Sequence, residues 1–225
     1  ADTACTESRS VRPGKRDRGL NVPTPPARRG NTERSGPAER VTLSFPEQSN
    51  LGRLGVWSPN EEHWIDLSLA QGVVEVPRAT KLMLEVRDAG DLPYVRQLVE
   101  MLVHLNLSDT TIQDADLEYV AELTHLEWLS LASTNISDSG LVNLAGLSRL
   151  RSLNLSWTGV SDAGMRVLAP LCALEALNLS CTFQRITSEG MSTICSFSRL
   201  KELNLSDTAV DDSGLVHLRA LSELC

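Results

Sequence analysis

The chain has 225 residues, of which 41% are hydrophobic and 22% charged, and its formal net charge is −8 at pH 7. This length is sufficient to bury a core in one elongated domain or in two small ones. The acidic balance excludes the basic surface typical of nucleic-acid-binding proteins, and no apolar run approaches the roughly 18 residues of a membrane span. We therefore expect neither a nucleic-acid partner nor a transmembrane segment.

The N-terminal residues 1–38 are rich in Arg, Pro, Gly and Ser and almost free of large apolar side chains. Residues 1–40 contain nine Arg or Lys against five Asp or Glu, whereas residues 41–225 contain 12 against 24. Such a segment cannot bury enough surface to offset the loss of chain entropy, so it is predicted to be disordered. We interpret it as a solvated tail; contact with an acidic partner or with the acidic body of the chain is the alternative.

Residues 39–88 are predicted to form a β-rich capping unit. Apolar and polar residues alternate in "VTLSF", "GVVEV" and "KLMLEV", between clusters of Pro, Gly and Asn, which is typical of short strands. We expect this unit to cover the first edge of the structure that follows. The segment "EEHW" at residues 61–64 places two carboxylates beside a histidine. No further ligand accompanies them, so a solvated turn is favoured over a metal site.

From about residue 90 the sequence is periodic. A helical segment, "DLPYVRQLVEML" at residues 91–102, precedes an L-x-x-L-x-L phrase that recurs at intervals of 24, 24, 24 and 26 residues. The last interval is longer because "TFQRI" replaces three-residue stretches such as "TGV". In each unit alternating leucines predict a strand, and apolar residues three apart predict a short helix. No single unit can bury its own leucines, so neighbouring units must stack. The aligned leucines are Leu105, Leu129, Leu153, Leu177 and Leu203.

The unit L-x-x-L-x-L-x-x-T-x-(V/I)-x-D-x-G-(L/M) resembles the leucine-rich repeat over residues 89–225. It is similar to a short bacterial class and, although its cysteine is missing, to the class found in F-box proteins. The resemblance implies an α/β leucine-rich repeat solenoid, or horseshoe, with a parallel sheet on the concave face and short helices on the convex face. The chain ends in "LSELC", where Leu224 begins another L-x-x-L phrase. We therefore expect either further repeats or a partner that covers this edge.

Three recurring side chains between strand and helix are interpreted as structural. A threonine is expected to bond to the backbone at the turn that leaves the strand. An aspartate, replaced by Ser188 in the fourth repeat, is expected to cap the helix N-terminus rather than bind a cation. A glycine is expected where successive coils pack tightly. The positions are Thr110, Thr134, Thr158, Thr182 and Thr208; Asp114, Asp138, Asp162 and Asp212; and Gly140, Gly164, Gly190 and Gly214.

Two outward positions vary from repeat to repeat, and we predict that they bind a partner. Trp128 and Trp157 lie in adjacent repeats, whose strands are expected about 5 Å apart. They are therefore predicted to form one exposed aromatic patch, with Cys181 and Phe183 beside it. The candidate partner-binding residues are Trp128, Trp157, His104, Asp109, Cys181, Phe183, Glu202 and Asp207.

The resemblance and the aromatic residues together predict a non-enzymatic module that binds a protein or peptide on the concave face. No catalytic, cofactor-binding or metal-binding residue is assigned, because the four histidines stand in unrelated contexts and no nucleophile or phosphate-binding motif occurs. One alternative is the substrate-recognition arm of a ubiquitin ligase, which requires an F-box-like segment that residues 1–90 do not show. The other is the recognition domain of a larger enzyme whose catalytic part lies outside this chain. The oligomeric state is left open.

Cysteine usage favours a reducing compartment, and hence the cytoplasm. The count is odd, and no C-x-x-C pair or metal-ligand spacing occurs among Cys5, Cys172, Cys181, Cys195 and Cys225. The sequence begins without Met and without an apolar signal core, so we expect either a removed leader or a fragment of a longer protein.

Overall fold

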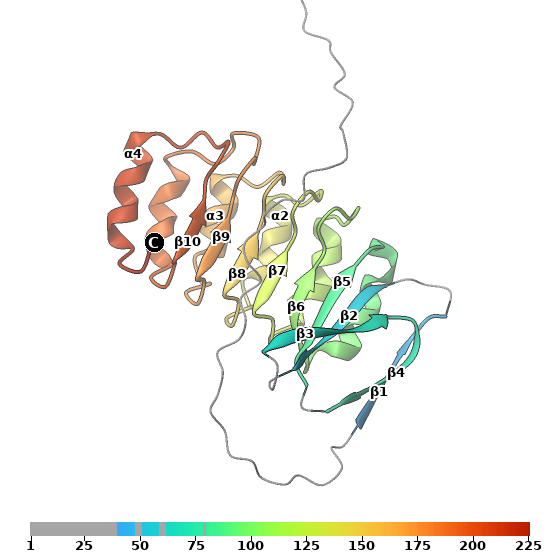
Figure 1. Ribbon diagram of the computed structural model, residues 1–225. Coiled ribbons are helices and arrows are strands. Elements are labelled where there is room, and N and C mark those ends of the chain that lie inside the picture. Colours follow the sequence, from blue (N-terminus) through green and yellow to red (C-terminus); the bar gives the residue numbers. More distant parts are fainter. Residues whose placement is uncertain (1–39, 48–50, 59–61, 79) are drawn as a thin grey trace, which may run out of the picture.

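The computed structural model describes residues 40–47, 51–58, 62–78 and 80–225 (Figure 1). The predicted tail at residues 1–38 lies outside them, as does Glu61 of the "EEHW" segment. Five strands come first and are mostly antiparallel. They are β1 (Arg40–Phe45), β2 (Gly52–Ser58), β3 (His63–Leu69), β4 (Gly72–Pro77) and β5 (Leu82–Val86).

These strands divide between two sheets. β1 pairs with β4 in a two-stranded sheet, whereas β2 pairs antiparallel with both β3 and β5. Apolar residues on one side of β5, namely Leu82, Leu84 and Val86, are buried in the core, as expected for a half-buried strand. β5 then pairs in parallel with the first strand of the repeats, so the N-terminal strands continue directly into the repeat sheet.

The repeats contribute five parallel strands whose leucines are aligned. Leu129 pairs with Leu105 on one side and with Leu153 on the other, and Leu177 pairs with Leu153 and Leu203. The 24- and 26-residue spacings therefore predicted the strand register correctly. The strands are β6 (Leu102–Asn106), β7 (Trp128–Ser130), β8 (Ser152–Asn154), β9 (Ala176–Asn178) and β10 (Glu202–Asn204).

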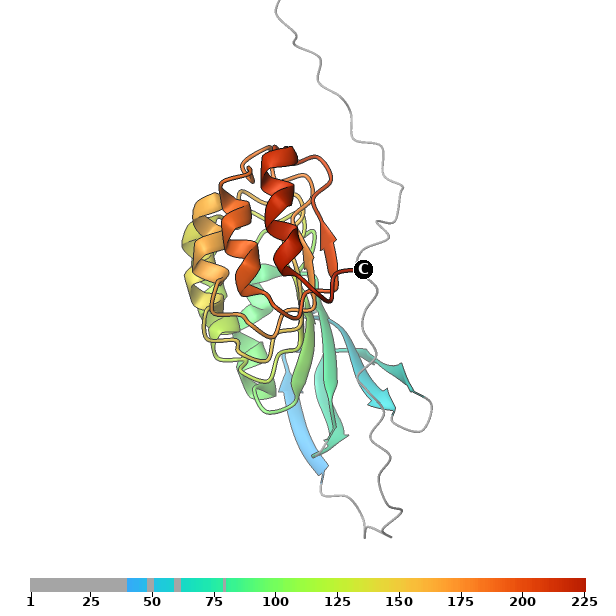
Figure 2. The same ribbon diagram turned by 90° about the vertical axis from the view of Figure 1, so that its left-hand side faces the viewer.

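Short helices cover the opposite side of this sheet, as Figure 2 shows. The leucines of every strand and the apolar residues of the helices form one continuous core, so the predicted α/β solenoid is confirmed. The segment before the first repeat is a 3-10 helix that ends at Leu98 rather than at Leu102, which already belongs to β6. The helices are η1 (Ala89–Leu98), η2 (Asp114–Leu117), α1 (Glu118–Ala121), α2 (Asp138–Leu141), η3 (Val142–Leu144), α3 (Asp162–Leu168), η4 (Gly190–Ser196), α4 (Asp212–Leu215) and η5 (Val216–Ala220).

The threonines bond to the backbone as predicted in four of the five repeats. Each hydroxyl donates to the carbonyl three residues earlier, at 2.5–2.7 Å, in Thr110, Thr134, Thr158 and Thr208. Thr182, in the lengthened repeat, has a buried hydroxyl without a hydrogen-bond partner in the described part of the chain. The extra residues of this repeat thus change the turn that the threonine otherwise fixes.

The aspartates do not cap their own helices, because the residue before each of them is the N-cap; this corrects the prediction for Asp114, Asp138, Asp162 and Asp212. At Ser137 and Ser161 the N-cap hydroxyl accepts from a backbone N–H group. The carboxylates instead join consecutive coils in what we call carboxylate bridges. In each bridge the carboxylate accepts the N–H and the hydroxyl of a residue in the next coil, at 2.5–2.8 Å. The pairs are Asp114–Ser137, Asp138–Ser161 and Asp162–Thr187.

The fourth repeat inverts this arrangement. Ser188 stands where the other coils have aspartate, and Asp211 stands where they have Ser or Thr. The Ser188 hydroxyl donates to Asp211 at 2.6 Å and accepts the Asp211 N–H at 3.1 Å, so one carboxylate and one hydroxyl still face each other. Hydrogen bonds from the Ser188 hydroxyl, and then from Ser213, lower the pKa of Asp211 to about 2. The exchange of residue types preserves the contact between coils.

The repeated glycines provide the space that the carboxylate bridges occupy. A Cβ on Gly164 would overlap Oδ1 of Asp138, and the same holds for Gly140 against Asp114. The first repeat has Asp116 at this place. Tight packing between coils, rather than an unusual backbone angle, therefore explains these glycines.

We predict that Gly164→Ala destabilises the solenoid by roughly 1–3 kcal/mol, the usual range for overpacking a close contact. The added methyl would displace the Asp138 carboxylate from Ser161. Urea unfolding measures the effect. Gly146→Ala is the matched control, because a Cβ there would have no atom within 4 Å; equal stability losses in the two variants would contradict the packing argument.

The inverted pair gives a second prediction. Ser188→Asp alone should lower the unfolding temperature, because it sets a second carboxylate against Asp211. Adding Asp211→Ser should restore most of the loss, since the double variant has the residue types of the other coils. If the second substitution lowers the unfolding temperature further, the two positions do not act as one pair.

Candidate partner-binding surface

Two of the predicted binding residues, His104 and Trp128, are not exposed, which corrects the sequence-based patch. Their exposed fractions are 2% and 9%. The ring of Trp64, on β3, lies 4.7 Å from that of His104, and the His104 ring stacks on Trp128 with centroids 6.0 Å apart. Trp57 packs edge-to-face on Trp64, with ring centroids 5.4 Å apart. We call Trp57, Trp64, His104 and Trp128 the buried aromatic row, in which His104 and Trp128 are buried and the two other rings are half-buried.

The covering strand explains this correction. β3 lies two strands beyond β5 in the sheet order, yet it crosses in front of β6 in Figure 1. Strands β2 and β3 form an antiparallel pair, which we call the N-terminal hairpin. The contact between Trp64 and His104 shows that this hairpin folds over the sheet face of the first repeats. The periodic pattern of the repeats contains no information about this non-repeated hairpin. The available signal was the pair of tryptophans at residues 57 and 64 in a chain with only 4% aromatic residues.

His104 is neutral at pH 7 in this environment. Burial lowers the pKa of its imidazole to about 4, and the positive charge of Lys81 lowers it further in the same direction. Within the described residues, His104 Nδ1 and the indole nitrogens of Trp64 and Trp128 are buried without hydrogen-bond partners. The buried aromatic row is thus held by ring packing, and it joins the capping strands to the repeats.

Trp157 lies on a different surface. It belongs to a column of residues at the turn that leaves each strand, and all five have φ of 56–60°, in the left-handed region that only a few side chains adopt readily. The Trp157 side chain is 51% exposed. Its N–H donates to the Ser180 carbonyl of the next coil, which holds the turn in place. The column comprises Asp109, Ser133, Trp157, Cys181 and Asp207.

The lengthened repeat brings Phe183 against Trp157. Phe183 and Gln184 also have left-handed φ, of 51° and 57°, so the backbone of the lengthened stretch turns at two consecutive residues. The ring centroids of Trp157 and Phe183 lie 6.4 Å apart, with the planes at 82°, an edge-to-face contact that aromatic rings favour. Phe183 is 64% exposed. We call these two residues the aromatic pair.

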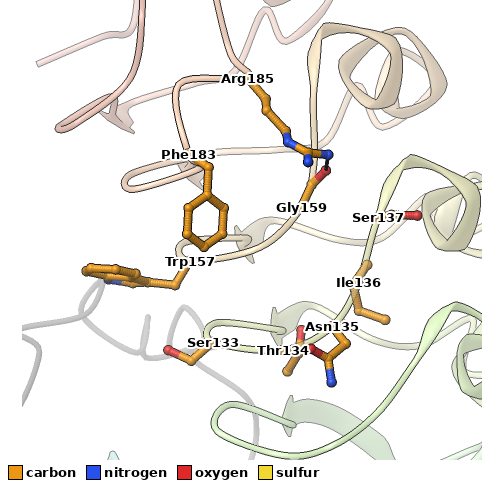
Figure 3. A pocket seen from close by; sticks show the side chains of 9 residues that line it. All are labelled: Ser133, Thr134, Asn135, Ile136, Ser137, Trp157, Gly159, Phe183 and Arg185. Atoms are coloured by element: carbon orange, nitrogen blue, oxygen red, sulfur yellow. Dashed lines mark hydrogen bonds between the residues drawn. The ribbon is translucent and has the colours of Figure 1, made fainter. Parts of the chain in front are cut away.

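A pocket of about 480 Å³ adjoins the aromatic pair (Figure 3). It is lined by three successive turns: residues 133–137, Trp157 with Gly159, and Phe183 with Arg185. Arg185 Nη1 donates to the Gly159 carbonyl at 3.3 Å, which places the guanidinium group across the preceding turn. We call this space the rim pocket. Sequence analysis did not identify Arg185 or Gly159, although the two-residue extension pointed to this loop.

The other predicted residues lie outside the rim pocket. Asp109 and Asp207 are exposed in the same column as Trp157, and Glu202 is exposed on β10. Cys181 is half-buried, with its thiol 3.5 Å from the Asp207 carboxylate. Small polar residues on the sheet face are largely buried in its centre, where Ser152, Asn154, Ser156, Asn178 and Ser180 are at most 8% exposed. The largest exposed side chains of this region are therefore at the turns.

Neither a metal cluster nor a membrane helix occurs in the described ranges. No group of three or more His, Cys, Asp or Glu side chains could hold a metal ion across residues 40–47, 51–58, 62–78 and 80–225. Over the same residues, no helix combines the length and apolarity that crossing a bilayer requires.

Comparisons with known proteins agree with this architecture. Residues 100–160 match one leucine-rich repeat family model, and residues 199–218 match another. An internalin (inlF) from Listeria monocytogenes has a similar structure, with a TM-score of 0.51 and 25% identity over 64% of this chain and 37% of that chain. Internalin C2 from the same species has 23% identity over 64% of this chain and 77% of that chain, with a TM-score of 0.42. No curated protein matches the sequence.

The repeats of this chain therefore form a leucine-rich repeat solenoid, similar in fold to that of the internalin (inlF). The chain spans little more than a third of the length of the internalin (inlF) chain, at 37%.

The buried histidine predicts a pH dependence of stability. Its pKa of about 4 in the folded state lies below the ordinary 6.5, so between these values the unfolded chain binds a proton that the folded chain does not. The stabilising contribution is complete above pH 6.5 and is lost as the pH falls to 4, by about 3 kcal/mol. Urea unfolding across this range should show the loss in the wild type and not in His104→Phe. Parallel curves for the two proteins would contradict the assignment to His104.

Proposed function

We propose that this chain is a non-enzymatic protein-interaction module, and that its partner binds the solenoid at the turn edge of the concave sheet face. The observation that carries the proposal is the aromatic pair, Trp157 and Phe183, which are 51% and 64% exposed. Large aromatic side chains supply much of the binding energy of protein interfaces when they become buried. An exposed pair in a chain with so few aromatic residues therefore marks the favoured contact point.

The repeat pattern supports this assignment. The position of Trp157 is occupied by Asp, Ser, Cys and Asp in the other repeats, so the solenoid does not require an aromatic residue there. The two extra residues beside Phe183 are also absent from the other repeats. Insertions in single repeats commonly map to loops on the binding face. Two independent departures from the repeat thus meet on one surface.

Of the other predicted residues, Asp109, Cys181, Glu202 and Asp207 remain candidates for the periphery of this interface. Polar groups around an apolar centre are the usual arrangement in protein–protein interfaces. His104 and Trp128 are excluded from the proposal, because the N-terminal hairpin already buries them.

The proposal is tested by selecting displayed random peptides on the purified full chain. We expect the selected peptides to bind the wild type and to lose at least tenfold in affinity, about 1.4 kcal/mol or more, for the variant Trp157→Ala with Phe183→Ala. Circular dichroism should be unchanged, because both side chains are exposed.

Val142→Ala is the matched control. Val142 is 63% exposed in η3, on the helical side of the solenoid, and its truncation should leave peptide binding unaffected. Selected peptides that bind the double variant as well as the wild type would refute the aromatic pair as the contact point.

A further inference from the structure

The rim pocket contains the guanidinium group of Arg185, which lies beside the aromatic pair. Residues 133–137, Trp157, Gly159, Phe183 and Arg185 line the pocket, and within the described part of the chain no carboxylate pairs with Arg185. We infer that this pocket binds a peptide segment that carries an Asp or Glu side chain next to a large apolar one. The carboxylate would bind the Arg185 guanidinium group, and the apolar side chain would pack on the aromatic pair. This inference rests on the proposed function and specifies the chemistry of the partner.

Two backbone hydrogen bonds hold the main chain of Arg185 in place. Its N–H donates to the Thr182 carbonyl at 3.0 Å, and its carbonyl accepts the Asp162 N–H at 3.3 Å. The guanidinium group then reaches the Gly159 carbonyl of the preceding coil at 3.3 Å. Figure 3 shows this bond on the side of the pocket opposite the Ser133 turn. These contacts direct the Arg185 side chain along the edge of the rim pocket.

Only one of the guanidinium N–H groups has a protein acceptor in the described residues. Arginine has five such donors in a planar fork, which matches the two oxygens of a carboxylate. The remaining donors of Arg185 are available to a ligand, because its side chain is exposed. Two of these remaining N–H groups can donate to the two oxygens of a ligand carboxylate.

Carboxylates among the described residues do not pair with the Arg185 guanidinium group. The nearby Asp162 carboxylate accepts both the N–H and the hydroxyl of Thr187, at 2.8 and 2.6 Å. Elsewhere in the repeats, Arg151 pairs with Glu175 and Arg166 with Glu189. Arg185 shares the lack of a described ion pair with Arg149 and Arg199, but of these three only Arg185 lines the pocket beside the exposed aromatic rings. The unpaired charge beside exposed aromatic rings therefore fits an acidic ligand rather than an internal ion pair.

The dimensions fit a peptide. A volume of about 480 Å³ lies within the usual range of ligand pockets. Trp157 and Arg185 belong to neighbouring coils, and neighbouring strands of a sheet are about 5 Å apart. In an extended peptide, side chains two residues apart lie on one face at about 7 Å. One acidic and one apolar side chain at that spacing would reach the guanidinium group and the aromatic pair together.

The test uses the full chain and peptides obtained from the displayed random library. We expect them to share an Asp or Glu within two residues of Leu, Ile, Phe or Trp. Replacing that acid by the corresponding amide should weaken binding about tenfold, as expected for the loss of a charge-assisted hydrogen bond. Arg185→Gln should cause the same loss, and the amide peptide should bind this variant no more weakly than the acid peptide does.

Arg149→Gln provides the matched control, since Arg149 is exposed outside the pocket and the substitution changes net charge equally. We expect acid peptides to bind it as they bind the wild type. Equal weakening by Arg149→Gln and Arg185→Gln would overturn the inference, because it would indicate attraction by overall charge. Equal binding of acid and amide peptides to the wild type would overturn it as well.

Two further outcomes separate this inference from the proposed function. If peptide binding depends on Trp157 and Phe183 but not on Arg185, the aromatic contact stands and the acidic specificity is wrong. If the selected peptides are basic and a synthetic peptide of residues 1–39 displaces them, the occupant is the chain's own N-terminal segment, and the inference is also wrong.

Discussion

The carboxylate bridge between coils is the contact on which the regular architecture depends. A single coil cannot bury its leucines, so each coil must find one register on its neighbour. The strands pair through only three residues each, which leaves few backbone hydrogen bonds to define that register. Asp138, held by the N–H and hydroxyl of Ser161, adds a second fixed point on the helical side. Gly164 provides the space for it, so three residue types form one unit across two coils.

This constraint also explains which positions are free to vary. The strand register fixes the start of the intervening turn, and the carboxylate bridge fixes its end. Asn154 accepts the Ser156 N–H, and the Thr158 hydroxyl donates to Leu155, so the backbone at residue 157 is held from both sides. Its left-handed φ directs the side chain away from the core. Asp, Ser, Trp and Cys therefore all occur in this column, because the core contacts of the coil do not depend on which side chain stands there.

Local periodicity predicted the solenoid well, and it predicted the surface poorly. Leucine spacing gave the strand register correctly because every coil repeats the same contacts. The aspartates were misassigned because capping and bridging both require a short acceptor at this turn; only the position of the next coil distinguishes them. Trp128 was misassigned because its cover, Trp64, lies in a non-repeated hairpin. The rim pocket likewise depends on how far two extra residues displace a turn, which spacing alone does not specify.

The two tryptophans thus have opposite roles, although both occupy positions that vary between repeats. Trp128 lies where the capping strands fold over the sheet, and its burial joins those strands to the first repeats. Trp157 lies at a different turn, in edge-to-face contact with Phe183 of the lengthened repeat. An aromatic residue at a variable position is consequently not evidence for binding until its neighbours are known. In this protein Trp64 of β3 packs on His104 beside Trp128, whereas the lengthened repeat places Phe183 and Arg185 beside the exposed Trp157.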